Sequence, residues 1–381
     1  MEKIRLGDVA TYINGYAFKP SDWSNDGVPI IRIQDLTGNS YQSNRYSGKY
    51  ESKYEIMAGD VLISWSASLG VYVWQGEKAV LNQHIFKVVF DKKEVDKNFF
   101  VHQTKSIMER ATAEVHGATM KHLTKPIFDA LPFYLPTVTE QKKIATELDK
   151  ITDLIDKRKK QLEKLDELVK SRFIEMFGNP VVNPKSWETA PLSTLIINAN
   201  NGMARRGKDE DGSIVLRLVE LQNGFIDYST PNRICLNETE KKRYELVDND
   251  FLFARVNGNP DYVGRCAVFK SIDEPVFHND HIIRVHFDET KINGFFMGVL
   301  LNSDYGKRQM REQIKTSAGQ YTISQDGIGA IMAILPPLEL QEQFAAFVEQ
   351  TDKSKFEIKQ SLEKLELLKK ALMQKYFGYG G

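Results

Sequence analysis

Several features that would assign a chain to a special class are missing from these 381 residues. There are only two cysteines, Cys235 and Cys266, without a Cys-x-x-Cys pair, so we expect small buried thiols in a reducing compartment and no disulfide framework. No apolar run approaches the ~18 residues of a membrane helix, and the N-terminal segment has no apolar signal-peptide core. These absences predict a cytoplasmic protein that does not associate with a membrane.

Charge of one sign is not in excess either. The sequence has 51 Lys and Arg residues and 51 Asp and Glu residues, so the formal net charge is zero. A protein that wraps nucleic acid over its whole surface is usually basic, and the balance counts against that arrangement. Local basic faces are still allowed, because acidic residues elsewhere can offset them. The length predicts two to three domains.

The common catalytic fingerprints are also missing: there is no HExxH zinc motif, P-loop or dinucleotide-binding loop. Residues 259–262 (Asn-Pro-Asp-Tyr) are similar to the Asn-Pro-Pro-Tyr motif of amino-methyltransferases, but they lack its second proline, so we favour a turn. Residues 278–281 (His-Asn-Asp-His) offer two imidazoles to a metal, yet the counterpart at 82–84 lacks most of these ligands. We therefore predict no catalytic, cofactor-binding or metal-binding residue in this chain.

The most informative feature that is present is a long internal repeat. Residues 136–178 and 336–378 align without a gap at a constant offset of 200 residues. Pro136 and Pro336 cannot lie inside a helix, and the glycines at the far ends are typical helix stops, so each copy is predicted to be one helix. The matching pairs include Leu135 with Leu335, Gln141 with Gln341, Ala145 with Ala345, Phe177 with Phe377, and 162–165 with 362–365.

Both copies carry a heptad seam, meaning apolar residues that alternate at spacings of four and three. The first seam is Ile144, Leu148, Ile151, Ile155, Leu162, Leu165, Val169 and Met176, interrupted by Arg158 and Arg172. The second is Phe344, Val348, Thr351, Ile358, Leu362, Leu365, Leu372 and Tyr376, interrupted by Lys355 and Lys369. Matched seams favour an antiparallel coiled coil over two helices that pack only on their own domains. About 38 residues of helix span roughly 57 Å, enough to hold two domains at a fixed distance.

The helices alternate with two globular domains, so the fold class is α+β, with two mixed α/β domains, two long helices and an internal pseudo-twofold duplication. The predicted boundaries are 1–138 and 187–335 for the domains, 139–178 and 338–378 for the helices, and 179–186 for the linker. Two Asn-Pro pairs predict that this linker is extended.

The two domains share one plan. In the first, the pattern predicts strands at 28–33, 61–65, 71–74 and 85–90 and a helix at 98–114. The second repeats short segments of the first at shifting offsets: 6–8 with 192–194, 14–15 with 201–202, 30–33 with 215–218, 60–63 with 250–253, 82–85 with 279–282, and Gly117 with Gly319. The loops between these segments differ in length and residues, which indicates two recognition surfaces with different targets on a common scaffold.

Loop residues of both domains have the types that contact DNA. Arg reads guanine, Asn and Gln read adenine, and Lys binds phosphate. The candidates in the first domain are Lys19, Arg45, Lys49, Lys53, Lys121 and His122, with Tyr41, Tyr46 and Tyr50 interleaved. Those in the second are Arg205, Arg206, Lys208, Arg255, Asn257, Asn259, Arg265, Gln320, Tyr321 and Thr322. Any single one of them is also compatible with an ordinary solvated surface, and we regard 241–243 (Lys-Lys-Arg) as a solvated helix face.

This architecture resembles the specificity subunits of type I restriction–modification systems. The resemblance covers essentially the whole chain and lies in two variable domains that alternate with two matching helices. Each helix follows a Leu-Pro step and then meets Glu140-Gln141 or Leu340-Gln341, so the Glu-Gln signature is kept only in the first copy. The repeated segments at 59–62 and 250–252 fit the same family.

The resemblance implies two target recognition domains, 1–138 and 187–335, that each read half of a bipartite site in double-stranded DNA. The helix pair would set the spacer and dock two modification subunits, which use S-adenosylmethionine to methylate adenine. Restriction subunits, which use ATP and Mg, would complete a nuclease. The chain itself would be non-catalytic. Two alternatives remain: a coiled-coil scaffold that does not bind DNA, and an enzyme that acts alone.

Overall fold

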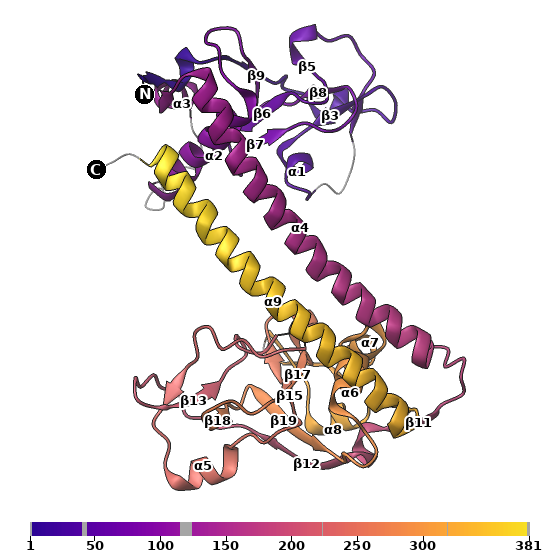
Figure 1. The fold of residues 1–381 in the computed structure, drawn as a ribbon. Helices are drawn as coiled ribbons and strands as arrows, with labels where there is room; N and C mark the ends of the chain where they lie inside the picture. The colour runs from indigo at the N-terminus through magenta and orange to yellow at the C-terminus, as the bar shows by residue number, and fades with distance from the viewer. Residues whose placement is uncertain (1, 40–43, 115–123, 223, 318, 379–381) are drawn as a thin grey trace. The chain divides into compact units, whose positions relative to one another are not determined.

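A computed structural model describes residues 2–39, 44–114, 124–222, 224–317 and 319–378 (Figure 1). The chain divides into two compact units. Unit 1 consists of Met1–Lys159 with Lys359–Gly381, and unit 2 consists of Lys160–Ile358. Each unit contains a globular part and portions of both long helices, α4 (Val138–Phe177) and α9 (Leu338–Phe377). The two repeated stretches are thus one helix each, whereas the domain limits given above stay predictions.

The globular part of unit 1 is built on two four-stranded sheets. One is antiparallel, in the order β2-β9-β6-β7, and the other has the order β4-β3-β8-β5, with β3 parallel to β8. The strands of these sheets are β2 (Thr11–Asn14), β3 (Val28–Ile31), β4 (Arg45–Tyr46), β5 (Glu55–Ile56), β6 (Val61–Ser64), β7 (Gly70–Val73), β8 (Ala79–Leu81) and β9 (Ile85–Val89). The other elements are the pair β1 (Glu2–Arg5) and β10 (Pro132–Leu135), and α1 (Ile33–Leu36), α2 (Lys97–Glu114) and α3 (Lys125–Ala130).

Unit 2 repeats this plan. Its antiparallel sheet has the order β12-β19-β15-β17, and its mixed sheet has the order β14-β13-β18, with β13 parallel to β18. A third sheet, β16-β21-β20, joins it. The strands are β11 (Glu188–Pro191), β12 (Ile196–Asn201), β13 (Ser213–Leu216), β14 (Arg233–Ile234), β15 (Asp250–Ala254), β16 (Val256–Asn257), β17 (Cys266–Val268), β18 (Val276–His278), β19 (Ile282–Phe287), β20 (Lys315–Ser317), β21 (Gln320–Thr322) and β22 (Met332–Leu335). The helices are α5 (Glu238–Tyr244), α6 (Gly294–Asn302), α7 (Asp304–Gln313) and α8 (Gln325–Gly329).

One of the two inner strands of each antiparallel sheet, β6 in unit 1 and β15 in unit 2, is apolar on both faces, and we call it the central strand. This explains why it forms an apolar run in the sequence. In β6, Val61 and Ile63 face one core of unit 1, while Leu62 faces a second, smaller core. Side chains alternate between the faces of a strand, so a sheet covered on both sides needs apolar residues at every position. In unit 2, alternate residues of β15 face two different cores in the same way.

The strand predicted at 28–33 ends earlier, at Ile31. The Arg32 backbone N–H donates to the Asp35 carboxylate (2.7 Å), and this bond starts the short helix α1 instead of a further ladder contact. Unit 2 makes the same turn, because the Arg217 N–H donates to the Glu220 carboxylate (2.7 Å). An acidic side chain three residues on competes with the strand for the backbone donor.

The long helices pack in opposite directions, as predicted. In unit 1, the Tyr376 hydroxyl of α9 donates to the Glu147 carboxylate of α4. In unit 2, Lys355 of α9 forms an ion pair with Asp166 of α4 at 2.7 Å. Early residues of one helix therefore meet late residues of the other within each unit.

The predicted seam is correct over most of its length but wrong at Arg172. Arg172 lies partly exposed over the Phe347 ring, and its neighbour Phe173 is the buried residue, with 3% of its surface exposed. An α-helix with 3.6 residues per turn drifts relative to a strict heptad, so the buried face moves by one position along α4. Of the predicted positions, the structure buries Ile144, Leu148, Ile151, Ile155, Val169, Phe344, Val348 and Thr351 and leaves the others half-buried.

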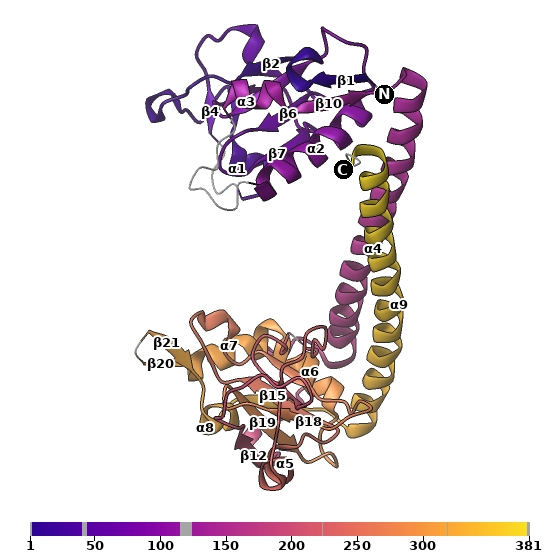
Figure 2. The same cartoon turned by 90° about the vertical axis from the view of Figure 1, so that its left-hand side faces the viewer.

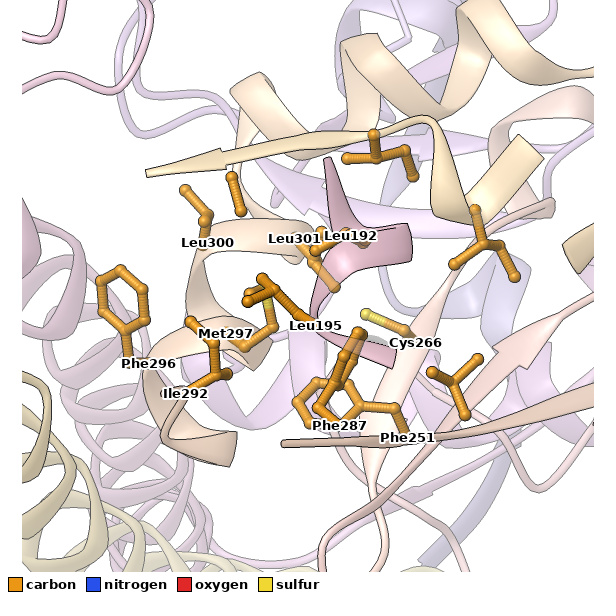
Figure 3. Packing of buried hydrophobic residues seen from close by; sticks show 14 of the residues in the cluster. Leu192, Leu195, Phe251, Cys266, Phe287, Ile292, Phe296, Met297, Leu300 and Leu301 are labelled. Atoms are coloured by element: carbon orange, nitrogen blue, oxygen red, sulfur yellow. The ribbon is translucent and has the colours of Figure 1, made fainter. Parts of the chain in front are cut away.

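Each long helix ends with a phenylalanine in a core. Phe177, the last residue of α4, packs in unit 2 with its ring 4.8 Å from that of Phe296 and 5.4 Å from that of Phe344. Phe377, the last residue of α9, packs in unit 1 with its ring 5.6 Å from that of Phe99. Figure 3 shows the apolar cluster of unit 2 to which Phe296 belongs. The repeat at Phe177 and Phe377 is therefore a repeat of core packing.

The two cysteines differ. Cys266 lies inside the apolar cluster of unit 2 (Figure 3), and burial raises the pKa of its thiol to about 12. Cys235 is exposed, contrary to the expectation that both thiols are buried. It directly follows the edge strand β14, where its backbone N–H donates to Asp209 (2.8 Å) and its side chain stays outside the core.

The linker after α4 forms turns and is not extended. Gly178 has a φ of +79°, which ends the helix in the left-handed conformation. The Asn179 side chain then accepts a hydrogen bond from the Val181 N–H (2.9 Å), and the Asn183 side chain bonds both the N–H and the carbonyl of Trp187. Asparagine side chains bind their own backbone in this way, and these bonds outweigh the extended preference of a residue before proline.

A buried glutamine fixes the start of each long helix. The Gln141 amide donates to the Pro136 carbonyl (2.9 Å) and accepts from the Asp96 N–H (2.7 Å). The Gln341 amide donates to the Pro336 carbonyl (2.8 Å) and accepts from the Asn293 N–H (2.9 Å). Both glutamines have at most 1% of their surface exposed. The bonds connect each helix to the segment that precedes α2 or α6, which explains the match between the two residues.

Replacing Gln341 by Ala is therefore expected to destabilise the protein. The change leaves a backbone donor and a backbone acceptor without their hydrogen-bond partner. Each unsatisfied buried group costs about 1–3 kcal/mol, so the free energy of unfolding should fall by about 2–4 kcal/mol. Urea titration measures this difference. Gln350→Ala is the matched control, because Gln350 lies on the same helix with an exposed side chain and should change the free energy by less than about 0.5 kcal/mol. Equal losses in the two variants would contradict the role of Gln341.

Candidate nucleic-acid interface

Two of the predicted cations of unit 1 already have acidic partners. The Arg45 guanidinium donates to the Gly27 carbonyl (2.5 Å) and to the Glu77 carboxylate (2.9 Å). Lys53 forms an ion pair with Glu51 (2.8 Å), a contact that raises the pKa of the lysine. A phosphate would have to compete with these carboxylates, so Arg45 in particular has a structural role that the sequence did not indicate.

The remaining candidates of unit 1 are two exposed lysines, Lys19 and Lys49. Lys121 and His122 lie outside the described residues, as does Tyr41. The interleaved tyrosines Tyr46 and Tyr50 pack against the small core around Phe18, and the rings of Tyr46 and Phe18 are 5.0 Å apart. These two tyrosines therefore contribute mainly to packing.

In unit 2 the structure brings two predicted arginines together at one acidic residue. The Arg206 guanidinium donates to the Asp280 carboxylate (2.6 Å) and lies 3.1 Å from Nε2 of His281. The Arg255 guanidinium donates to the backbone carbonyl of Asp280 (3.1 Å). We call Arg206, Arg255, Asp280 and His281 the arginine cluster. It holds two cations and one carboxylate, so it is locally basic although the chain is neutral.

A second group of predicted residues meets in the sheet β16-β21-β20. Asn257 pairs with Tyr321 across β16 and β21, and Gln320 and Thr322 lie on either side of Tyr321. Figure 2 shows β20 and β21 extending from the body of unit 2. Gln320 is exposed, whereas Tyr321 packs partly against the core. A two-stranded ribbon of this kind has dimensions that fit the major groove of DNA.

Four predicted residues of unit 2 lie apart from these two groups. Arg205 turns toward α5 and forms an ion pair with Glu240 (3.0 Å). Arg265 lies over the Tyr262 ring at 4.4 Å from its centroid. Asn259 starts the 3-10 turn Pro260–Tyr262 by accepting from the Asp261 N–H (3.0 Å), which confirms the turn predicted there. Lys208 is exposed.

Comparison with known proteins agrees with this architecture. A family model described as the type I restriction modification DNA specificity domain matches residues 1–167. The specificity subunit of the type I restriction enzyme StySPI from Salmonella potsdam is 26% identical, over 98% of this chain and 87% of that protein. The EcoBI specificity subunit from Escherichia coli is 25% identical, over 98% of this chain and 85% of its own.

The chain belongs to the family of type I restriction–modification specificity subunits. The crystal structure of the type I S subunit from M. genitalium has the same fold, with a TM-score of 0.61, 15% identity, and coverage of 100% of this chain and 96% of that one. A specificity subunit determines which DNA sequence is recognised and is not a catalytic component. These relatives give no support to a scaffold that does not bind DNA.

Among the described residues, no group of His, Cys, Asp and Glu side chains is arranged to hold a metal ion. Over the same part of the chain, no helix is long and apolar enough to cross a bilayer. Residues 278–281 connect two strands: His278 ends β18, and Ile282 begins β19.

Asp280 and His281 accompany Arg206 and were not among the predicted DNA-binding residues, because their residue types at 278–281 are also those of metal ligands. Trp65 was not among the predicted residues either; it follows β6, and its indole N–H donates to the Asn14 side chain (3.1 Å). The alignment of 60–63 with 250–253 contained the signal. Extended by two residues, it places Trp65 opposite Arg255, a predicted DNA-binding residue.

The burial of His278 predicts that unit 2 of this specificity subunit is sensitive to acid. The side chain is fully buried, and burial lowers the pKa of its imidazole from the ordinary 6.5 to about 4. The unfolded chain therefore binds a proton below pH 6.5 that the folded chain does not bind until about pH 4. The stabilisation by this neutral histidine is complete above pH 6.5 and is lost as the pH falls toward 4, by up to about 1.4 kcal/mol per pH unit.

We expect His278→Leu, which introduces the residue found at the matching position 81, to reduce this acid sensitivity. The free energy of unfolding of the variant should fall less steeply than that of the natural protein between pH 6.5 and 4. Urea titrations at a series of pH values measure the two slopes. Parallel curves would show that His278 does not titrate as its burial indicates.

Proposed function

We propose that this specificity subunit reads a bipartite site in double-stranded DNA, with one half-site for unit 1 and one for unit 2. The observation that carries the proposal is the duplication. Both units have a four-stranded antiparallel sheet with the same strand order and a mixed sheet with one parallel strand pair, but different exposed residues in the loops. At two positions of the arginine cluster, Arg255 and Asp280 of unit 2, unit 1 has Trp65 and Gln83. A repeated scaffold with different exposed residues suits two different half-sites.

The helix pair then determines the spacer between the half-sites. Both helices run for 40 residues, and neither contains a proline or glycine that would weaken it. A continuous helix of 40 residues is about 60 Å long, longer than one ~34 Å turn of B-DNA. The length of the helices, and not a flexible segment, is what we expect to fix the spacer.

The same helices dock two modification subunits. Leu168 of α4 and Leu368 of α9 occupy equivalent positions of the repeat, and each has 48% of its surface exposed. An exposed leucine at the same place in both copies indicates one binding patch present twice, which suits two copies of one partner. The modification subunits would supply S-adenosylmethionine and the methylation of adenine, and restriction subunits would supply ATP- and Mg-dependent cleavage. The assembly would be cytoplasmic.

A methylome tests the function directly. The chain is expressed with its modification subunit in a host without adenine methylation, and modified bases are located across the genome. We expect methyladenine in a motif of two short half-sites around a spacer of fixed length. A single continuous motif would show that only one unit reads DNA, and an unmodified genome in the presence of the assembled complex would reject the proposal.

The spacer is tested by lengthening both helices together. One heptad added after Lys160 in α4 and one after Gln360 in α9 preserve the pairing pattern and add about 10.5 Å, or about three base pairs. The methylome should then show the same half-sites with a spacer about three base pairs longer. Altered half-site sequences, or an unchanged spacer, would contradict the idea that the helices set the distance.

The stoichiometry is tested at the two exposed leucines. Leu168→Asp should lower the number of bound modification subunits from two to one, and the double variant with Leu368→Asp should bind none, because a charge at each patch opposes apolar docking. Native mass spectrometry counts the subunits. Leu154→Asp is the control: Leu154 is 44% exposed, but the matching residue is Ser354, so it lies outside the repeated patch. Loss of both partners in a single variant would contradict two independent patches.

A further inference from the structure

The two units share a set of loop contacts that we call the loop frame. It consists of residues 14–16, 65 and 82–85 in unit 1 and residues 201–203, 255 and 279–282 in unit 2. In both units, three backbone N–H groups donate to the same three partners. These bonds are Gly15 to Ile85 (3.0 Å), Gln83 to Tyr16 (2.9 Å) and Trp65 to His84 (3.2 Å) in unit 1, and Gly202 to Ile282 (3.3 Å), Asp280 to Met203 (3.0 Å) and Arg255 to His281 (2.8 Å) in unit 2.

Close backbone approach restricts which residues the loop frame can contain. A Cβ atom at Gly15 would lie 2.0 Å from the carbonyl oxygen of Asn82, and one at Gly202 would lie 2.3 Å from that of Asn279. Only glycine fits at these two positions. Tyr16 and Met203 form matching parallel bridges with the same asparagines. The frame is therefore a fixed support whose bonds use the backbone and do not depend on the neighbouring side chains.

The side chains carried by the loop frame differ between the units. The position after the central strand is Trp65 in unit 1 and Arg255 in unit 2. The position that precedes the shared histidine is Gln83 in unit 1 and Asp280 in unit 2. Equal backbone geometry with unequal polar side chains is what two readers of different sequences require, because bases are distinguished by hydrogen-bond pattern.

In unit 2, the contacts of Arg206 hold its guanidinium in one orientation. It donates to the Asp280 carboxylate (2.6 Å) and the Ala204 carbonyl (2.8 Å), and it lies 3.1 Å from His281. Its side chain nevertheless has 52% of its surface exposed. An arginine that is held by a carboxylate and still exposed loses little conformational entropy on binding, and bidentate contact to guanine depends on its orientation. A phosphate contact makes no such demand.

We propose that Arg206 and Arg255 read guanine in the half-site of unit 2, with Asp280 as the positioning residue of Arg206. In unit 1, Trp65 and Gln83, which stand where unit 2 has Arg255 and Asp280, read bases of the other half-site. This inference rests on the proposed function, since it assigns base contacts within the half-sites. It identifies Trp65, Gln83 and Asp280 as specificity-determining residues.

The test uses the full chain assembled with its modification subunit. The methylome and competitive DNA binding are compared for the natural protein, Arg206→Ala, Arg255→Ala and Asp280→Ala. Each variant should relax one G·C position of a single half-site, with at least about a fivefold loss of discrimination, the low end for a bidentate contact. Arg243→Ala, which removes an exposed cation from α5 of the same unit, should leave the motif unchanged.

Asp280→Ala separates positioning from simple charge. It keeps both arginines, so the slope of log affinity against log salt should not fall, while the motif relaxes at the position that Arg206→Ala relaxes. A phosphate contact by Arg206 would give the opposite result: uniformly weaker binding, a lower salt slope by about 0.9 and an unchanged motif. That outcome for Arg206 and Arg255 would overturn the proposal.

The residues proposed for unit 1 are tested independently of those in unit 2. Trp65→Ala and the smaller change Gln83→Ala should each relax the other half-site only. If both leave the motif as it is while the complex assembles and methylates, the assignment to unit 1 is wrong. A failure of the proposed function gives a different result, because the natural protein itself would then lack a bipartite motif. In that case the proposed function and the base contacts inferred from it are both wrong.

Discussion

The burial of one aromatic residue at the end of each long helix is the contact on which the architecture depends. Phe177 ends α4 inside the core of unit 2, and Phe377 ends α9 inside the core of unit 1. Each ring contributes about 1.5–3 kcal/mol by leaving water. Because α4 also contributes Ile144 and Leu148 to the core of unit 1, a single helix belongs to the cores of both units. The helices are therefore structural parts of the globular units and not appended rods.

Repeated residues and recognition residues occupy different places in this fold. The residues that match between the copies serve the backbone: glutamines that bond the helix starts, phenylalanines in the cores, and glycines in the loop frame. The residues that differ, such as Trp65 and Arg255, are half-buried side chains next to that support. Because the supporting bonds are made by the main chain, side chains next to them can change without loss of the fold. A specificity subunit needs this separation, since its targets vary while its assembly does not.

The sequence predicted long-range order better than local contacts. An offset constant over some forty residues, with proline at one end and glycine at the other, leaves little choice but two long helices, and the structure has them at 138–177 and 338–377. The position of Phe173 was missed, because the drift of a real helix against a heptad accumulates along its length. The turns at Asn179 and Asn183 were missed, because asparagine side chains compete locally with the extended form.

The candidate interface could be predicted only by residue type. Which carboxylate engages an arginine depends on segments that are distant in sequence: Glu77 engages Arg45, Glu240 engages Arg205, and Asp280 engages Arg206. Those pairings follow from sheet order, which a single sequence does not supply. Asp280 is a candidate only because the fold places it beside Arg206, whereas Trp65 follows from the sequence once the match of 60–63 with 250–253 is extended by two residues.

The division of the chain also has a consequence for its synthesis on the ribosome. Unit 2 is one continuous segment, 160–358, whereas unit 1 combines 1–159 with the last part of α9. Unit 2 can therefore complete its core as soon as residue 358 has emerged. Unit 1 is made first, but part of its apolar surface stays uncovered until Phe377 has been synthesised. Its core therefore remains incomplete during the synthesis of more than half the chain. Domains usually fold in the order in which they are made, and this topology reverses that order.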